Sequence, residues 1–526
     1  MRILSYKNCI LLLTTILLTH LTCFSQVGIG TLEVDPSAIL EIKSNSKGFI
    51  PPRIADPFVI DAPFNGLTIY NTTERCLQIN RGTPQLPLWT CIGQDLVSQN
   101  FILKETLGST SLTVAPNTKA LVPNLSRTII VPPGGKRYFL VNANIPVNTT
   151  GPSSGVLELN GVAVASHSAE ASKINNHIKM IDLVTYLELD EGTHTLEVHI
   201  LAGDNGVSVN LPNTDPSVAP VNPIGETIIG KAELITLESS TSLGVFTTEV
   251  GTTETTIMAG TEMVIPGLSH TLIVPSGKTH YVTINVDIPI LDTDMSTVIL
   301  NVDGTPVMAR TGNSSLVNSK VKSVSFQKYL ELDGGIHTIT VSVFAGASNA
   351  TVNMENTHAL VSSLVPTGLA DFGKGKLQVL NNNLSWTSFT EVEGTTEITI
   401  PANTVLPIPG LQHTFEVEPG DSANLMIIID IPVTSATPST GILVVNNAFI
   451  AETGTDEAQE DNNSIHSINF KRGAVLPPGT YTLDVRLLAG ENDVKVNAAD
   501  TDSSIVPVKP NGLNNMGKAT MQILYY

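Results

Sequence analysis

The chain has 526 residues, of which 14% are charged, and a formal net charge of −20 at pH 7. This acidity argues against non-specific binding to nucleic acid or to an anionic membrane surface. The length is sufficient for several domains.

The first 25 residues have the features of a secretory signal peptide. Arg2 and Lys7 precede a short apolar run, and Cys23 and Ser25 occupy the −3 and −1 positions of a cut after Ser25. A lipoprotein cut before Cys23 is the alternative, although the residues before it fit that cut poorly. No later segment has the ~18 unbroken apolar residues of a membrane-spanning helix. We therefore expect an exported protein, either extracellular or on the outer cell surface.

Residues 26–98 are expected to form a small β-rich module. Its sequence contains "VGIGT", "GFIPPR" and "GLTIYN" in that order, followed by "WTCI". In this it resembles the N-terminal module of exported Bacteroidota surface proteins and of related fibre-like proteins. The resemblance implies a position ahead of variable repeats or a fibre tip, and it implies no catalytic residues.

Signal cleavage would leave two of the four cysteines, Cys76 and Cys91, both in this module. In an exported chain such an isolated pair predicts one disulfide. The alternative is two free thiols, which an oxidising compartment disfavours.

A long repeat fills the rest of the chain. The stretch "GTHTLEVHILAG" at 192–203 returns as "GIHTITVSVFAG" at 335–346 and "GTYTLDVRLLAG" at 479–490, and an Ile-Pro pair recurs every 143 residues. Short runs rich in Val, Ile and Thr alternate with Pro, Gly, Asn and Asp, which is typical of strands and turns. The sequence therefore predicts an all-β fold with three tandem, jelly-roll-like β-sandwiches at 103–237, 246–380 and 389–526.

The order of the late strands resembles the C1q/tumour-necrosis-factor type of jelly roll. The quoted segments are "GKRYFLVNANIPV", "GVLELNGVAVA", "TYLELDEGTHTLEVHIL" and "GKAELITL". Such domains generally trimerise, which implies an intramolecular pseudo-trimer of the three repeats as a hypothesis. Three separate beads joined by the polar linkers 238–245 and 381–388 are the alternative.

Two histidines in the first copy of the stretch raise the question of a metal site. His194 and His199 differ in parity along a strand, so they should face opposite sides of the sheet and should not chelate one metal together. His199 aligns with Ser342 and Arg486, as an exposed variable position would. His194 aligns with His337 and Tyr481, which predicts a ring with a polar tip at the edge of the core.

Few residues are candidates for catalysis or metal binding. Ser153 stands in a G-x-S-x-G match, but the strand-to-helix context that a nucleophile elbow needs is not expected there. Oxygen-rich loops provide calcium candidates at Asp292, Asp294, Asp500 and Asp502, and a further acidic run contains Asp456, Glu457, Glu460 and Asp461. None of these loops supplies a full calcium cage, and at Asp500-Thr501-Asp502 a turn is favoured over an ion. We expect no catalytic residues and no cofactor.

These observations favour a non-enzymatic, adhesin-like or structural protein that presents loops to an unknown surface glycan or protein. The alternative is a carbohydrate-binding or carbohydrate-active secreted protein. Aromatic residues make up only 5% of the chain, which argues against sugar stacking.

Overall fold

A computed structural model describes most of residues 26–525. The longest stretches outside the description are 93–100, 170–177, 313–320 and 455–464. The chain divides into two compact units, Met1–Asp95 and Leu96–Tyr526, which we call the N-terminal module and the repeat body. The expected signal peptide lies outside the described residues. Within the described part of the chain, no helix has the length and apolarity needed to cross a membrane.

The N-terminal module contains two small sheets. One pairs β1 (Val27–Ile29) with β2 (Leu40–Ile42) in parallel, and the other has the order β3-β4-β5-β6. Its strands are β3 (Arg53–Ile54), β4 (Thr68–Asn71), β5 (Cys76–Asn80) and β6 (Trp89–Ile92), with a 3-10 turn η1 (Pro57–Val59). Cys76 is disulfide-bonded. The backbone register places Cys91 opposite Gln78 of β5, and the pairing of Cys76 with Cys91 remains a prediction.

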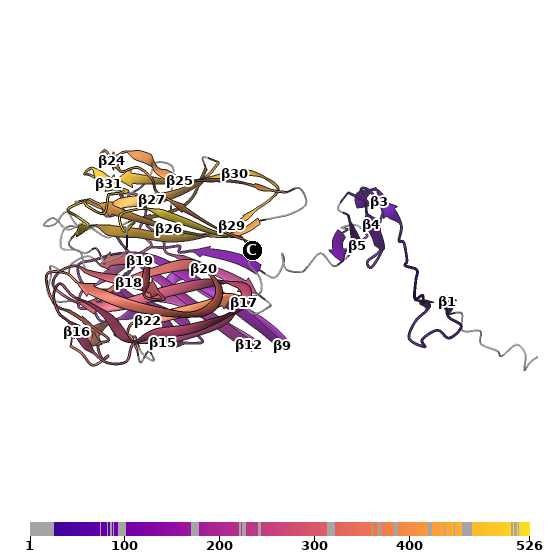
Figure 1. The fold of residues 1–526 in the computed structure, drawn as a ribbon, viewed down its shortest axis with the longest axis horizontal. Helices are drawn as coiled ribbons and strands as arrows, with labels where there is room; N and C mark the ends of the chain where they lie inside the picture. Colours follow the sequence, from indigo (N-terminus) through magenta and orange to yellow (C-terminus); the bar gives the residue numbers. More distant parts are fainter. Residues whose placement is uncertain are drawn as a thin grey trace, which may run out of the picture. The chain divides into compact units, whose positions relative to one another are not determined.

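Three sets of strands follow one another in the repeat body (Figure 1). The first set is β7 (Phe101–Leu107), β8 (Leu112–Val114), β9 (Lys119–Thr149), β10 (Ser153–Leu159), β11 (Val162–Ala169), β12 (Lys179–Ala202), β13 (Val207–Val209) and β14 (Glu233–Ser239). The second is β15 (Val245–Val250), β16 (Thr255–Ile257), β17 (Glu262–Leu291), β18 (Ser296–Val302), β19 (Thr305–Gly312), β20 (Val321–Ala345), β21 (Ala350–Val352), η4 (Ser362–Leu364) and β22 (Lys376–Asn382). The third is β23 (Ser388–Glu393), β24 (Ile398–Ile400), β25 (Val405–Val417), β26 (Ala423–Thr434), β27 (Ser439–Val445), β28 (Ala448–Gly454), β29 (His466–Leu476), β30 (Gly479–Ala489), β31 (Val494–Val496) and β32 (Thr520–Tyr525).

Each repeat is a two-sheet β-sandwich, so the predicted all-β fold class is confirmed. In the third repeat one sheet has the order β23-β32-β26-β31-β24, with β29 beside β26, and the other has the order β25-β30-β27-β28. A cluster of fully buried Ile, Val and Leu side chains fills the space between them. In the third repeat two separate strands take the place of each long strand of the other repeats. In the first two repeats the long strands β9, β12, β17 and β20 are continuous, so each belongs to both sheets of its sandwich.

The burial pattern changes along these long strands. The first part of β17 contains many exposed positions, whereas the part after His280 is almost continuously buried. A strand with one solvent-facing side should alternate, and a strand covered on both sides should not. The second parts of the long strands are therefore covered both by the facing sheet and by another layer.

The parity argument for the two histidines is confirmed, but the exposure expected for His199 is wrong. Leu196 and Ile200 are fully buried on the core side of β12. His199 points to the other side, yet only 12% of its side chain is exposed. Its imidazole lies against Glu158 of the adjacent strand β10, with 3.4 Å between Nδ1 and Oε2.

A ring with a polar tip does occupy the position of His194 in every repeat. His194 Nε2 lies 2.9 Å from the carbonyl oxygen of Asp190, and His337 Nε2 lies 2.8 Å from that of Asp333. The Tyr481 hydroxyl donates to the carbonyl of Pro477 at 2.9 Å. The ring thus closes the hairpin four residues before it, which explains why His and Tyr are interchangeable there.

Sequence reasoning missed a buried asparagine that ties each sandwich together. Asn353 is fully buried with φ 58°. Its Nδ2 donates to the carbonyls of Thr253 and Pro266 at 3.2 and 3.0 Å, and its Oδ1 accepts from the Gly375 amide at 3.1 Å. Asn210 and Asn497 make the corresponding bonds in the other repeats. A Gly-Lys pair recurs in each repeat, at 230–231, 373–374 and 517–518. It serves the same junction, because the Nζ atoms of Lys231, Lys374 and Lys518 donate to the carbonyls of these asparagines.

We expect Asn353→Ala to lower the free energy of unfolding by about 3 kcal/mol, because it leaves buried backbone groups without their hydrogen-bond partner. Asn403→Ala is a matched control, since Asn403 is exposed and has φ 57°. It should cost at most about 1 kcal/mol, because alanine lacks the local side-chain hydrogen bonding that lets asparagine tolerate the left-handed region. Chemical denaturation of both variants measures the difference. Equal losses would show that the buried hydrogen bonds add nothing.

Candidate functional site

All three repeats contribute to one apolar cluster, which we call the axial cluster. It is built from side chains of all three sandwiches: Leu140, Tyr186, Leu237, Tyr329, Leu380, Met426, Ile428 and Leu524. Several of these side chains occupy aligned positions in their repeats, as expected around a pseudo-three-fold axis. The repeats therefore pack against one another within one compact unit and are not three separate beads.

The first and second repeats meet through a polar and an aromatic contact. His167 Nδ1 lies 3.1 Å from Asp287 Oδ1, and the His167 side chain is only 10% exposed. The rings of Tyr186 and Phe246 lie 4.7 Å apart between centroids. Burial raises the pKa of Tyr186 above its ordinary value, so this phenol stays protonated.

The second and third repeats meet through a buried ion pair and a backbone contact. The guanidinium of Arg310 pairs with the carboxylate of Asp430, and their side chains are 7% and 2% exposed. The amide of Gln522 bonds to both backbone groups of Tyr329. Its Oε1 accepts from the nitrogen at 3.0 Å and its Nε2 donates to the oxygen at 3.2 Å.

The third and first repeats meet through a charged cluster. Arg472 pairs with Glu105 at 2.6 Å and with Glu233. Burial raises the pKa of Glu233 to about 8, and the neighbouring Glu105 adds to this effect while Arg472 opposes it. Gly473 stands where the other repeats have tyrosine, and a Cβ there would lie 2.4 Å from a methyl carbon of Leu103. Leu103 thus packs into space that only glycine leaves.

Aligned positions carry different partners at different interfaces. His167 aligns with Arg310, and Asp287 aligns with Asp430, so the two pairs are equivalent contacts made with different basic residues. The corresponding residues of the remaining interface are Thr453 and Asn144 in the sequence, and neither is charged. The repeats are therefore not interchangeable around the axis, although they share one fold.

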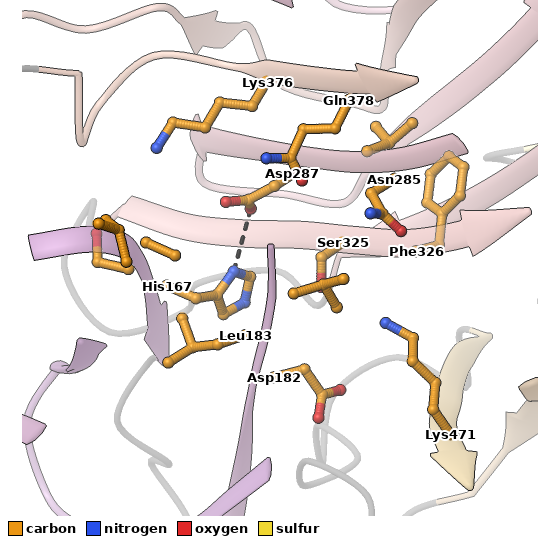
Figure 2. A pocket seen from close by; sticks show the side chains of 15 residues that line it. His167, Asp182, Leu183, Asn285, Asp287, Ser325, Phe326, Lys376, Gln378 and Lys471 are labelled. Carbon is orange, nitrogen blue, oxygen red and sulfur yellow. Dashed lines mark hydrogen bonds and ion pairs between the residues drawn. The ribbon is translucent and has the colours of Figure 1, made fainter. Parts of the chain in front are cut away.

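A small cavity lies between the repeats, with a volume of about 50 Å³ (Figure 2). His167, Asp182, Asp287, Lys376 and Lys471 are among the labelled side chains that line it. Burial lowers the pKa of Lys471 to about 8, and Asp182 acts in the opposite direction. A polar cavity of this size has room for a few water molecules at ~10–15 Å³ each. We therefore interpret the cavity as a hydrated part of the interface between the repeats.

The calcium candidates in the second repeat are engaged by other groups. Asp292 is buried, lies 2.7 Å from Lys322 Nζ and accepts a hydrogen bond from Ser296. Asp294 accepts from the backbone amide of Ala347 at 2.5 Å.

The candidates in the third repeat are also engaged. Asp500 lies 3.2 Å from Lys509 Nζ. Asp502 pairs with Lys495 at 2.7 Å and accepts from the Ser504 amide and hydroxyl, which is a turn geometry. The Lys495 and Ser504 hydrogen bonds lower the pKa of Asp502 to about 2. The acidic run at 456–461 lies outside the described residues.

Ser153 opens strand β10 and is fully buried. A further strand follows β10 along the chain, whereas a nucleophile elbow leads into a helix. The local structure at Ser153 therefore lacks the context of that motif.

Residues 28–105 match the family model described as a phage tail like trimerisation region. No curated protein matches the chain. Among solved structures, a triple jelly-roll protein of an archaeal virus turret is 10% identical, with 80% of this chain and 95% of that chain covered and a TM-score of 0.16. The insecticidal delta-endotoxin Cry8Ea1 of Bacillus thuringiensis is 11% identical, with 61% and 60% covered and a TM-score of 0.17. Scores this low carry no argument about this chain.

Proposed function

We propose that this protein is a non-enzymatic, exported structural or adhesin-like protein. In this proposal the repeat body is a rigid head, and the N-terminal module joins three chains so that three heads are displayed together. The loops of the repeats then bind a surface glycan or protein. The signal peptide expected from the sequence supports export.

The exposed apolar surface of the N-terminal module carries the proposal. Large apolar side chains are solvent-exposed there in unusual number: Val27, Ile29, Leu32, Ile39, Leu40, Ile42, Phe49, Ile50, Phe58, Val59, Phe64 and Leu67. Exposed apolar patches mark interaction surfaces when they are large. The match of residues 28–105 to a trimerisation region favours further copies of this chain as the partners.

The polar clusters of the repeat body support a structural role. The ion pairs of Arg310 and of Arg472 each join two repeats, and so does the contact between His167 and Asp287. These groups hold the head together and leave the loops as the variable surface.

Association through the module is tested by light scattering after gel filtration of the chain without residues 1–25. We expect the mass of three chains for the wild type and of one chain for the double variant Phe49→Asp/Ile50→Asp, because buried, unpaired carboxylates are costly. Ile273→Asp is the matched control, since Ile273 is 67% exposed on the repeat body, as Phe49 is on the module. A monomeric wild type, or a trimer that survives the double variant, would contradict association through this surface.

The binding role is tested with the same proteins on glycan and protein arrays. Display of three heads should raise the apparent affinity for a dense target by about 100-fold or more over the single-headed variant. Turnover of any array ligand by the purified protein would argue for the enzyme class instead.

A further inference from the structure

The outer face of the first sandwich carries an unusual pair of acids. Glu158 of β10 stands directly opposite Glu197 of β12 in the antiparallel ladder. Two like charges in such a cross-strand pair destabilise a sheet unless a cation lies between or beside them. The charge of Glu158 is especially costly without a cation, because its side chain is only 5% exposed.

A histidine completes the group. His199 lies two residues after Glu197 on the same face of β12, with its Nε2 3.9 Å from Glu197 Oε2 and its Nδ1 3.4 Å from Glu158 Oε2. One ligand atom from each of the three side chains falls within 4.8 Å of the others. The buried Nδ1 of His199 has no hydrogen-bond partner.

The corresponding positions of the other two repeats do not hold two acids and a histidine. In the second repeat Asn301 donates to Ser342 at 3.1 Å, and Ser342 donates to Glu262 at 2.6 Å. In the third repeat Val444 replaces the first acid, and Arg486 bonds to Asp484 at 2.7 Å. Among the described parts of the repeats, the first alone collects two carboxylates and an imidazole at this place.

We propose that Glu158, Glu197 and His199 bind a divalent first-row transition metal ion, with zinc as the best fit. Two carboxylate oxygens and one imidazole nitrogen, with water in the fourth position, suit tetrahedral zinc. Calcium needs six to eight oxygen ligands, which these side chains do not supply. The ion takes the place of Lys119, whose ammonium pairs with Glu158 when the ion is absent. The Lys119 side chain is 35% exposed and is free to turn into solvent.

The test uses the tag-free chain without residues 1–25, stripped with a chelator and titrated with Zn²⁺ in a calorimeter and with Co²⁺ by visible absorption. We expect uptake of one ion per chain at this site. His199→Ser introduces the residue that the second repeat has at this position. It should weaken Zn²⁺ binding by at least about 100-fold, because even the loss of an outer-shell partner can weaken metal binding by that factor. His194→Ala is the matched control and should bind as the wild type does, because His194 faces away from the acids.

Lys119→Leu separates a metal site from a purely structural ion pair. The third repeat also has an uncharged aliphatic residue at this position, namely Val405. Removing the competing ammonium should tighten Zn²⁺ binding by about fivefold or more. Even in water, the repulsion between the ammonium and the metal ion at contact distance corresponds to a factor of this size. Thermal melts without metal verify that each variant is folded. No ion uptake by the wild type, equal binding by His199→Ser, or weaker binding by Lys119→Leu would each overturn the proposal.

Discussion

Replacing Arg310 by methionine is expected to lower the free energy of unfolding by about 3–5 kcal/mol, because the carboxylate of Asp430 is then left buried without its cation. Both side chains are almost completely buried between the second and third repeats, so water cannot take over the lost contact. Chemical denaturation of the full-length protein measures the effect. Lys136→Met is the exposed control. It removes a partner of Glu188 at a site where both side chains are about half exposed, so its effect on stability should be much smaller than that of Arg310→Met.

The double variant Arg310→Met/Asp430→Leu tests the reason for this loss. Replacing both partners of a buried pair by apolar residues is often neutral, because no charge is left stranded. We therefore expect the double variant to recover most of the stability that the single variant loses. A double variant as unstable as the single one would mean that Arg310 acts through packing and not through its charge.

Tyr329→Ala should cost about 3–5 kcal/mol, the usual range for removing a large aromatic side chain from a packed core. Tyr329 is 1% exposed in the axial cluster, and its ring lies edge-on to that of Phe389 in the third repeat, 6.4 Å away between centroids. The loss therefore falls on the association of repeats as well as on the second sandwich. Tyr329→Phe is the control, because it retains the ring, and it should cost less than about 1.5 kcal/mol.

Two readouts distinguish these outcomes. The denaturation midpoint gives the loss of stability, and limited proteolysis of the linkers 238–245 and 381–388 reports whether the repeats still hold one another. We expect faster cleavage in Tyr329→Ala than in Tyr329→Phe. Equal stability of the two variants would show that the axial cluster does not stabilise the body.

The sequence alone predicted the strand faces of the repeats. Leu196, Val198 and Ile200 point inward because side chains alternate strictly along a strand, and no distant contact can change that period. The same logic placed His194 and His199 on opposite sides. The Gly-Lys pair also recurs in every copy of the sequence, although the carbonyls to which Lys374 donates became visible only in the fold.

Only the tertiary structure decided which outward-facing residues are covered. His199 was expected to be exposed because its position varies between repeats, yet Glu158 and Lys119, distant in sequence, pack around it. The axial contacts were missed for the same reason, since Arg310 and Asp430 lie on different repeats and no local pattern links them. A signal did exist in "LMIIIDIPV" at 425–433, where apolar residues occur at both parities along one strand. Which surface covers the second face depends on the association of whole domains, and strand periodicity carries no information about that.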